Sequence, residues 1–152
     1  MITLEKFFEA LNQVEARGRK RNVPAGDGGT RIGPLQISEI YWKDAREWMN
    51  KQNTHFIPDI YWSWTYCEDW EFSKTIAFIY FRRWAPKALR EGNWEVLARI
   101  HNGGPNGHKK KATLEYWEKV KEALEVCLAH GLKPGAPMMT IDHSKVPVQP
   151  DN

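Results

Sequence analysis

Cysteine is scarce in this chain, which has only Cys67 and Cys127 among 152 residues. Two cysteines exclude a disulfide framework, and a chain that folds without one suits a reducing cytosol. Long hydrophobic runs are also missing. No stretch approaches the roughly 18 apolar residues of a membrane span, and residues 1–6 show no basic-then-apolar signal pattern. We therefore expect neither export signal nor membrane anchor, and synthesis in the cytoplasm.

A strong charge of one sign is absent as well. The chain has 22 basic and 19 acidic residues and a net charge of +3, which indicates little about partners. The basic runs 17–21 and 109–111 are typical of a solvated surface, so we expect no nucleic-acid partner. Five histidines and two cysteines lack zinc-ligand spacing, so neither a metal nor another cofactor is expected.

Aromatic residues, in contrast, are abundant: eight Trp, five Tyr and six Phe. Trp is rarely fully buried, so we expect some of these rings to line a groove. Sugars stack their C–H faces on such rings, which makes a carbohydrate site one interpretation and a Trp-rich core the other. The length is sufficient for one domain with a substantial core.

Apolar periodicity predicts a mainly α-helical domain over residues 1–131, followed by a Pro-rich tail at 132–152. Thr3 caps a first helix that ends before Arg17, and Ser38 caps a second that runs to about Asn50. Further helices are expected at 67–84, at 94–100, and after Thr113 as far as Gly131. Residues 51–64 are expected to form a loop.

Two segments rich in glycine interrupt the helices. Residues 22–33 predict a small hairpin or Ω-like loop after the first helix. Six consecutive loop-forming residues, Asn102 to Gly107, lie between His101 and His108, and such turns often present polar groups to a ligand.

Two carboxyl groups occupy contrasting positions. Glu15 lies close to the apolar stripe of the first helix, where desolvation is expected to raise its pKa. Asp27 stands among glycines, where backbone N–H groups favour the charged form. A retaining glycosidase needs such a pair, one protonated acid and one ionised carboxylate about 5 Å apart. Either residue alone is more often an ordinary surface or turn residue.

Three segments together resemble the invertebrate-type lysozymes. Residues 98–107 and 113–117 resemble the family's Ala-Arg-Ile-His-Asn-Gly-Gly-Pro-Asn-Gly and Thr-Leu-x-Tyr-Trp, and residues 33–37 resemble Gly-Pro-Phe-Gln-Ile. The resemblance spans about residues 11 to 120. It departs from the family at Ala16-Arg17, where the family has Ser-Gly, and at His108, where the family has Cys.

The resemblance implies a mainly α (α+β lysozyme-like) fold with a small β-hairpin or irregular insertion after the first helix. It implies a muramidase that hydrolyses β-1,4 bonds of peptidoglycan by retention, with Glu15 as acid and base and Asp27 as nucleophile. The missing apolar runs predict no membrane partner; the localisation stays open, and cytoplasmic synthesis followed by release onto the cell wall is one interpretation. The substrate-binding residues expected are Gln36, Tyr41, Trp42, His101, Asn102 and Gly103. Structural roles remain open for four of these residues. Tyr41 and Trp42 could instead pack the second helix, and His101 and Asn102 could instead hold the turn at Gly103-Gly104-Pro105 in place.

Two other functions remain open. A lytic transglycosylase would use Glu15 without Asp27, because a hydroxyl of the sugar itself attacks. A non-catalytic carbohydrate-binding module would keep the fold without the chemistry. Chitin, another polymer that contains N-acetylglucosamine, remains an alternative substrate.

Overall fold

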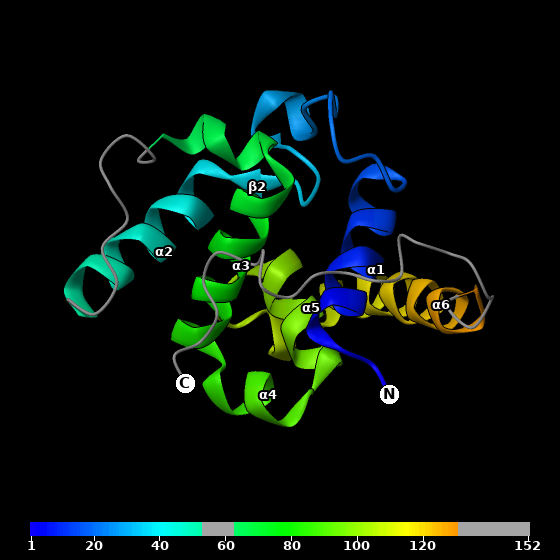
Figure 1. Ribbon diagram of the computed structural model, residues 1–152. Coiled ribbons are helices and arrows are strands. Elements are labelled where there is room, and N and C mark those ends of the chain that lie inside the picture. The colour runs from blue at the N-terminus through cyan, green and yellow to red at the C-terminus, as the bar shows by residue number, and fades with distance from the viewer. Residues whose placement is uncertain (53–62, 131–152) are drawn as a thin grey trace.

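The computed structural model describes residues 1–52 and 63–130, and helices dominate this part of the chain (Figure 1). The α-helices are α1 (Leu4–Ala16), α2 (Glu39–Gln52), α3 (Trp70–Trp84), α4 (Pro86–Glu91), α5 (Trp94–Gly103) and α6 (Leu114–His130). Short 3₁₀ helices are η1 (Asp27–Gly29), η3 (Trp64–Glu68), η4 (Gly107–Lys109) and η5 (Lys111–Thr113). The predicted tail at 132–152, and most of the predicted loop at 51–64, lie outside the described residues.

An antiparallel hairpin follows α1. It pairs β1 (Arg31–Ile32) with β2 (Ile37–Ser38), so that Arg31 is opposite Ser38 and Ile32 is opposite Ile37. The prediction of a mainly α-helical domain with a small hairpin after the first helix is confirmed. The hairpin itself lies at 31–38, and the earlier part of the glycine-rich segment forms η1.

The predicted caps explain where the first two helices begin. Thr3 Oγ1 accepts a hydrogen bond from Lys6 N at 3.2 Å, and Ser38 Oγ accepts one from Tyr41 N at 3.2 Å. At the other end of α1, Arg17 adopts a left-handed conformation with φ 54°, which stops the helix one residue beyond Ala16.

Three helix boundaries differ from the prediction. The helix expected at 67–84 is two elements, because the Asp69 side chain accepts a bond from Phe72 N at 2.8 Å and starts α3 at Trp70. Pro86, which was expected to end the preceding helix, is the first residue of α4. Proline is suited to this position because the N–H groups of the first helical turn have no partner within the helix. Helix α5 runs on to Gly103, so the loop expected from Asn102 begins at Gly104.

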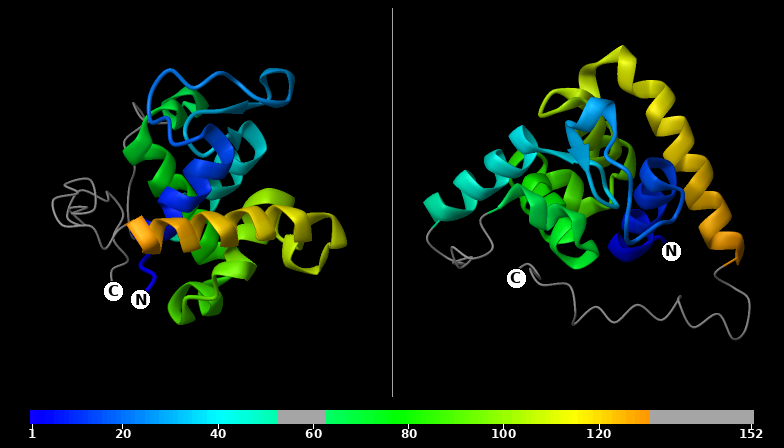
Figure 2. Two further views of the ribbon diagram at one scale, coloured as in Figure 1. Left: turned by 90° about the vertical axis from the view of Figure 1, so that its right-hand side faces the viewer. Right: turned by 90° about the horizontal axis from the view of Figure 1, so that it is seen from above.

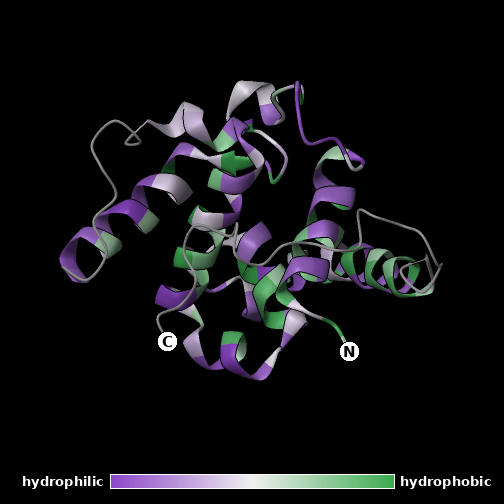
Figure 3. Cartoon of the chain, in the orientation of Figure 1, coloured by the Kyte–Doolittle hydropathy of each residue, from purple (hydrophilic) through white to green (hydrophobic). Residues whose placement is uncertain are grey.

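The core lies where α1, α3 and α5 meet. The rings of Phe7 and Phe8 lie with their centroids 6.1 and 6.4 Å from that of Phe81, and Phe7 stacks on Trp94 at 5.0 Å. Hydrophobic residues are correspondingly dense on α3 and α5 at the centre of Figure 3. Helix α6 packs along α1, as the right-hand view of Figure 2 shows.

A buried ion pair joins α1 to α3. Lys74 Nζ lies 3.3 Å from Glu5 Oε2, and the two side chains are 2% and 3% exposed. Glu71 Oε2 lies 3.1 Å from the same ammonium. Charges this far from water are tolerated only when they are paired, so this pair fixes how the two helices meet.

The hairpin is held against η3. Gly33 has φ 78°, and a Cβ at this position would collide with the carbonyl of Cys67, so the close approach requires glycine. Trp64 Nε1 donates to Ile37 O at 2.8 Å. Asn12, on α1, donates from Nδ2 to Pro34 O at 3.0 Å, and this bond holds the hairpin beside the end of α1.

Candidate functional site

Glu15 lies in the last turn of α1 with its side chain only 13% exposed. Tyr116, in the first turn of α6, donates its phenolic hydrogen to Glu15 Oε2 at 2.9 Å. His101 Nε2, from α5, lies 3.5 Å from the same oxygen. Two helices that follow Glu15 by more than 80 residues therefore fix its carboxyl group, and both contacts fall on Oε2.

His101 is buried and bonded at both ring nitrogens. Nε2 lies 2.9 Å from Leu35 O, which can only accept, so Nε2 carries a hydrogen. Nδ1 lies 2.9 Å from the Tyr41 hydroxyl, which donates to it in the neutral ring. The imidazole thus connects the hairpin backbone, α2 and Glu15.

Burial shifts the titration of the tyrosines around the site. It raises the pKa of Tyr116 well above 10, and the charge of Glu15 and the hydrogen bond to it raise that pKa further, whereas Arg31 lowers it. Burial likewise raises the pKa of Tyr41, with smaller contributions that include Tyr80 and Glu15. Both hydroxyls therefore keep their protons and remain donors at neutral pH.

These shifts predict that the free energy of unfolding falls in alkaline solution. Burial raises the pKa of Tyr80 to about 12, whereas unfolded tyrosines ionise near 10. Above pH ~10 the unfolded chain has released protons that the native chain retains, so stability is complete below that pH and declines above it. Each buried tyrosine contributes a slope of up to about 1.4 kcal/mol per pH unit.

Urea unfolding between pH 9 and 11.5 measures this decline. Tyr80→Phe is expected to make it shallower, and the more exposed Tyr66 provides a matched Phe control that leaves the buried tyrosines in place. An unchanged slope in the Tyr80 variant would show that this residue does not contribute.

Asp27 lies in η1 at the start of the hairpin, with φ 51° and a side chain that is 71% exposed. Its Oδ2 lies 3.2 Å from Arg31 Nε. The backbone beside it is fixed by the bridge between Gly26 and Arg31, whose N–H groups bond each other's carbonyls at 2.9 and 3.2 Å. No contact joins Asp27 to Glu15 in the described structure, and the nucleophile role of Asp27 stays a prediction.

The structure gives three of the expected substrate-binding residues packing or bonding roles. Gln36 is 7% exposed and its amide donates to Gly33 O at 3.0 Å, which ties the hairpin turn together. Tyr41 is 7% exposed and bonded to His101. Trp42 is 6% exposed, and its Nε1 finds no hydrogen-bond partner in the described residues. Substrate contacts for these three stay predictions.

The remaining expected residues end α5, where Asn102 and Gly103 are half-buried. Gly103 O accepts a bond from Lys110 Nζ at 2.6 Å. Thr113, which was expected to cap the last helix, directly precedes α6. Its hydroxyl oxygen lies 2.7 Å from Gly107 O and accepts a hydrogen bond from Arg99 Nε at 2.9 Å. Side chains at the two ends of this loop therefore fix its shape.

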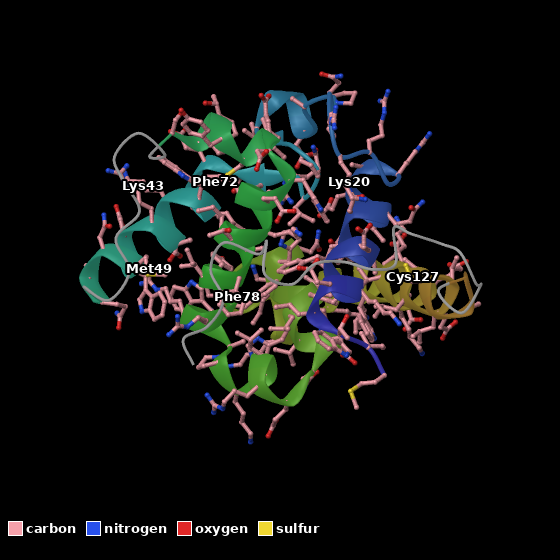
Figure 4. The ribbon with its side chains drawn as sticks, in the orientation of Figure 1. Lys20, Lys43, Met49, Phe72, Phe78 and Cys127 are labelled. Carbon is pink, nitrogen blue, oxygen red and sulfur yellow. The ribbon has the colours of Figure 1, made fainter. Side chains whose placement is uncertain are left out.

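A hollow of about 770 Å³ lies beside the hairpin, next to the N-terminal end of α3. The side chains of Trp70 and Tyr66 line it, and the sequence had predicted that some aromatic rings would line a groove. Lys20, which is labelled in Figure 4, borders the same hollow. None of the expected site residues lines this hollow. Among residues 1–52 and 63–130, no group of three ligands suits a metal ion, and no helix is long and apolar enough to span a membrane.

Two residues of the site were missed as site residues by the sequence analysis. Tyr116 lies inside the Thr-Leu-x-Tyr-Trp segment, which was the available signal, but no spacing rule shows that it meets a residue 101 positions earlier. Arg31 had no signal beyond its place in the glycine-rich segment.

A helical domain with a short hairpin after its first helix, and a largely buried glutamate at that helix end, defines a lysozyme-like fold. Residues 7–123 match the family model described as Destabilase, and the chain belongs to this family. A lysozyme of Magallana gigas is 34% identical over 90 residues, which are 59% of this chain and 58% of that protein.

Further relatives carry similar names. Invertebrate-type lysozyme 6 of Caenorhabditis elegans is 32% identical over 97 residues, 62% of this chain and 67% of its own. A lysozyme of Meretrix lusoria is 27% identical over 122 residues, 80% of this chain and 90% of its own. The matches to the first two proteins thus span about three fifths to two thirds of their length.

Proposed function

We propose that this protein is a lysozyme that hydrolyses β-1,4 glycosidic bonds of bacterial peptidoglycan with retention. The observation that carries the proposal is the carboxyl group of Glu15, which Tyr116 and His101 hold at a largely buried helix end. A fixed carboxyl in such a setting is what a general acid for glycoside cleavage requires. The lysozyme names of the matched relatives support the same reading.

The proposed reaction uses both carboxyl groups. The contacts of Glu15 fall on Oε2, so Oε1 is the oxygen that gives its proton to the leaving glycosidic oxygen. Asp27 forms a bond to the anomeric carbon as the C–O bond breaks. Glu15 then takes a proton from water, whose oxygen displaces Asp27 and restores both groups. Residues 22–37, the start of α2 and residues 101–104 would border the sugar chain.

Asp27→Asn separates this mechanism from that of a lytic transglycosylase. We expect the substitution to lower the rate of wall hydrolysis at least about 100-fold, because an amide cannot form or stabilise the glycosyl intermediate. Clearing of a wall suspension, with mass analysis of the released ends, measures this. Glu91→Gln, which changes an exposed carboxylate at the end of α4, is the matched control and is expected to retain the wild-type rate.

The exposure of Asp27 and its ion pair with Arg31 are the observations that favour the transglycosylase. Near-wild-type clearing by Asp27→Asn, with anhydro-muramic ends, would decide for that enzyme. Binding of wall without release of fragments by the wild type would instead indicate a carbohydrate-binding module.

A further inference from the structure

Arg31 occupies a fixed position beside Asp27, one of the two carboxyl groups of the proposed site. Its backbone forms the bridge to Gly26 and the pairing with Ser38, so β1 holds the residue on both sides. Its side chain is 30% exposed, with Nε 3.2 Å from Asp27 Oδ2. The guanidinium is therefore anchored at one nitrogen and open to solvent at part of its surface.

The two Nη groups of Arg31 are unused within residues 1–52 and 63–130. The ion pair with Asp27 involves Nε, and no other hydrogen bond or ion pair of the guanidinium is formed with described side chains. The positive charge also acts on the phenol that holds Glu15, because Arg31 lowers the pKa of Tyr116 against the effect of burial. The free donors thus lie on the guanidinium that contacts Asp27, where they can meet the same ligand as the proposed nucleophile.

An arginine with two free Nη groups is suited to one kind of partner. Its planar donors match the two oxygens of a carboxylate, and such charge-assisted pairs are stronger than neutral hydrogen bonds. The exposed basic residues Arg17, Arg19 and Arg21, which follow Glu15 directly along the chain, add positive charge beyond this end of α1. This basic run had no role in the proposed function.

We propose that Arg31 binds a carboxylate of the substrate and thereby makes the site prefer anionic peptidoglycan to neutral chitin. This inference rests on the proposed function, whose substrate class it narrows. In peptidoglycan every second sugar carries a lactyl ether that ends in a carboxyl group, either free or extended by a peptide with carboxylates of its own. Chitin has the same β-1,4 link and N-acetyl groups but no carboxylate.

Binding without turnover tests this proposal. Glu15→Gln and the double variant Glu15→Gln/Arg31→Gln are sedimented with intact cell walls, with glycan strands stripped of peptide, and with chitin. We expect the Arg31 substitution to weaken binding to carboxylate-bearing polymers about tenfold, the size of one charged hydrogen-bonded contact, and to change chitin binding less than about twofold. Arg31→Lys in the same background should restore part of the loss, since it keeps the charge without the planar donors.

Arg90→Gln is the matched control for net charge. Arg90 is exposed on α4, at the opposite end of the molecule from the hairpin in Figure 1, and its removal is expected to leave all three affinities unchanged. A loss confined to intact walls would identify a peptide carboxylate as the partner, and a loss on stripped strands would identify the lactyl group.

Equal weakening on chitin would overturn the proposal, because Arg31 would then only position Asp27 and the hairpin. Unchanged binding to walls would overturn it as well. The proposed function fails separately: if Glu15→Gln binds walls through Arg31 but the wild type releases no fragments, the recognition stands and the hydrolase does not. If Glu15→Gln binds none of the three polymers, both fail.

Discussion

Glu15→Gln is expected to lower the rate of peptidoglycan hydrolysis by about 10²- to 10⁴-fold, the range that general acid–base catalysis contributes. Glutamine fills the same space and still accepts the Tyr116 hydrogen bond, but its amide cannot give a proton to the leaving oxygen. The free energy of unfolding should change little. Release of soluble wall fragments at matched protein concentration measures the effect.

Glu115→Gln is the control for this experiment. Glu115 precedes Tyr116 in α6 and its side chain is 85% exposed, so the substitution removes a neighbouring carboxylate without touching Glu15. It is expected to leave the rate unchanged. If Glu15→Gln is as active as the wild type, Glu15 is not the general acid of this protein.

Lys74→Ala is expected to destabilise the protein by about 3–5 kcal/mol. The substitution leaves the Glu5 carboxylate at 3% exposure without the ammonium 3.3 Å away, and breaking a buried pair by removing one partner costs this much. It also removes the positive charge next to Glu71. Urea unfolding followed by circular dichroism measures the loss.

An exposed ion pair provides the comparison. Lys119 lies 3.8 Å from Glu115 on α6, with side chains 62% and 85% exposed. Lys119→Ala should therefore cost no more than about 0.5 kcal/mol, as exposed pairs four residues apart do. Similar losses in the two variants would show that burial does not set the strength of the Lys74 pair. The double variant Glu5→Leu/Lys74→Met should recover much of the loss, because it replaces both charges with apolar groups.

Local chemistry explains which parts of the fold the sequence predicts. Thr3 and Ser38 begin helices because their side chains cap nearby N–H groups, an interaction within three residues that sequence reveals directly. The break before α3 was missed because Asp69 stands between Glu68 and Glu71, and the sequence does not show which of these acidic residues caps a helix. Helix α5 passes Asn102 because the residue that ends it is Gly104, which has φ 88° and donates its N–H to Ile100 O.

The site was less accessible from sequence because its contacts join distant segments. Glu15 was found through resemblance and through its place beside the apolar stripe of α1. Its partner Tyr116 comes from α6, and His101 meets Tyr41 across 60 residues and Leu35 across 66. Only the packing of α1 against α5 and α6 brings these groups together. Gln36 and Tyr41 lie inward, where Gln36 bonds the backbone of the hairpin and Tyr41 bonds His101.

The most direct test of the central claim is the mass of the fragments that the wild-type protein releases from purified peptidoglycan. Hydrolysis adds one water at each cut, so the account predicts soluble fragments that end in reducing N-acetylmuramic acid. Fragments lighter by one water, with anhydro-muramic ends, would contradict the retaining hydrolase. The absence of fragments from walls of several compositions would contradict catalysis itself.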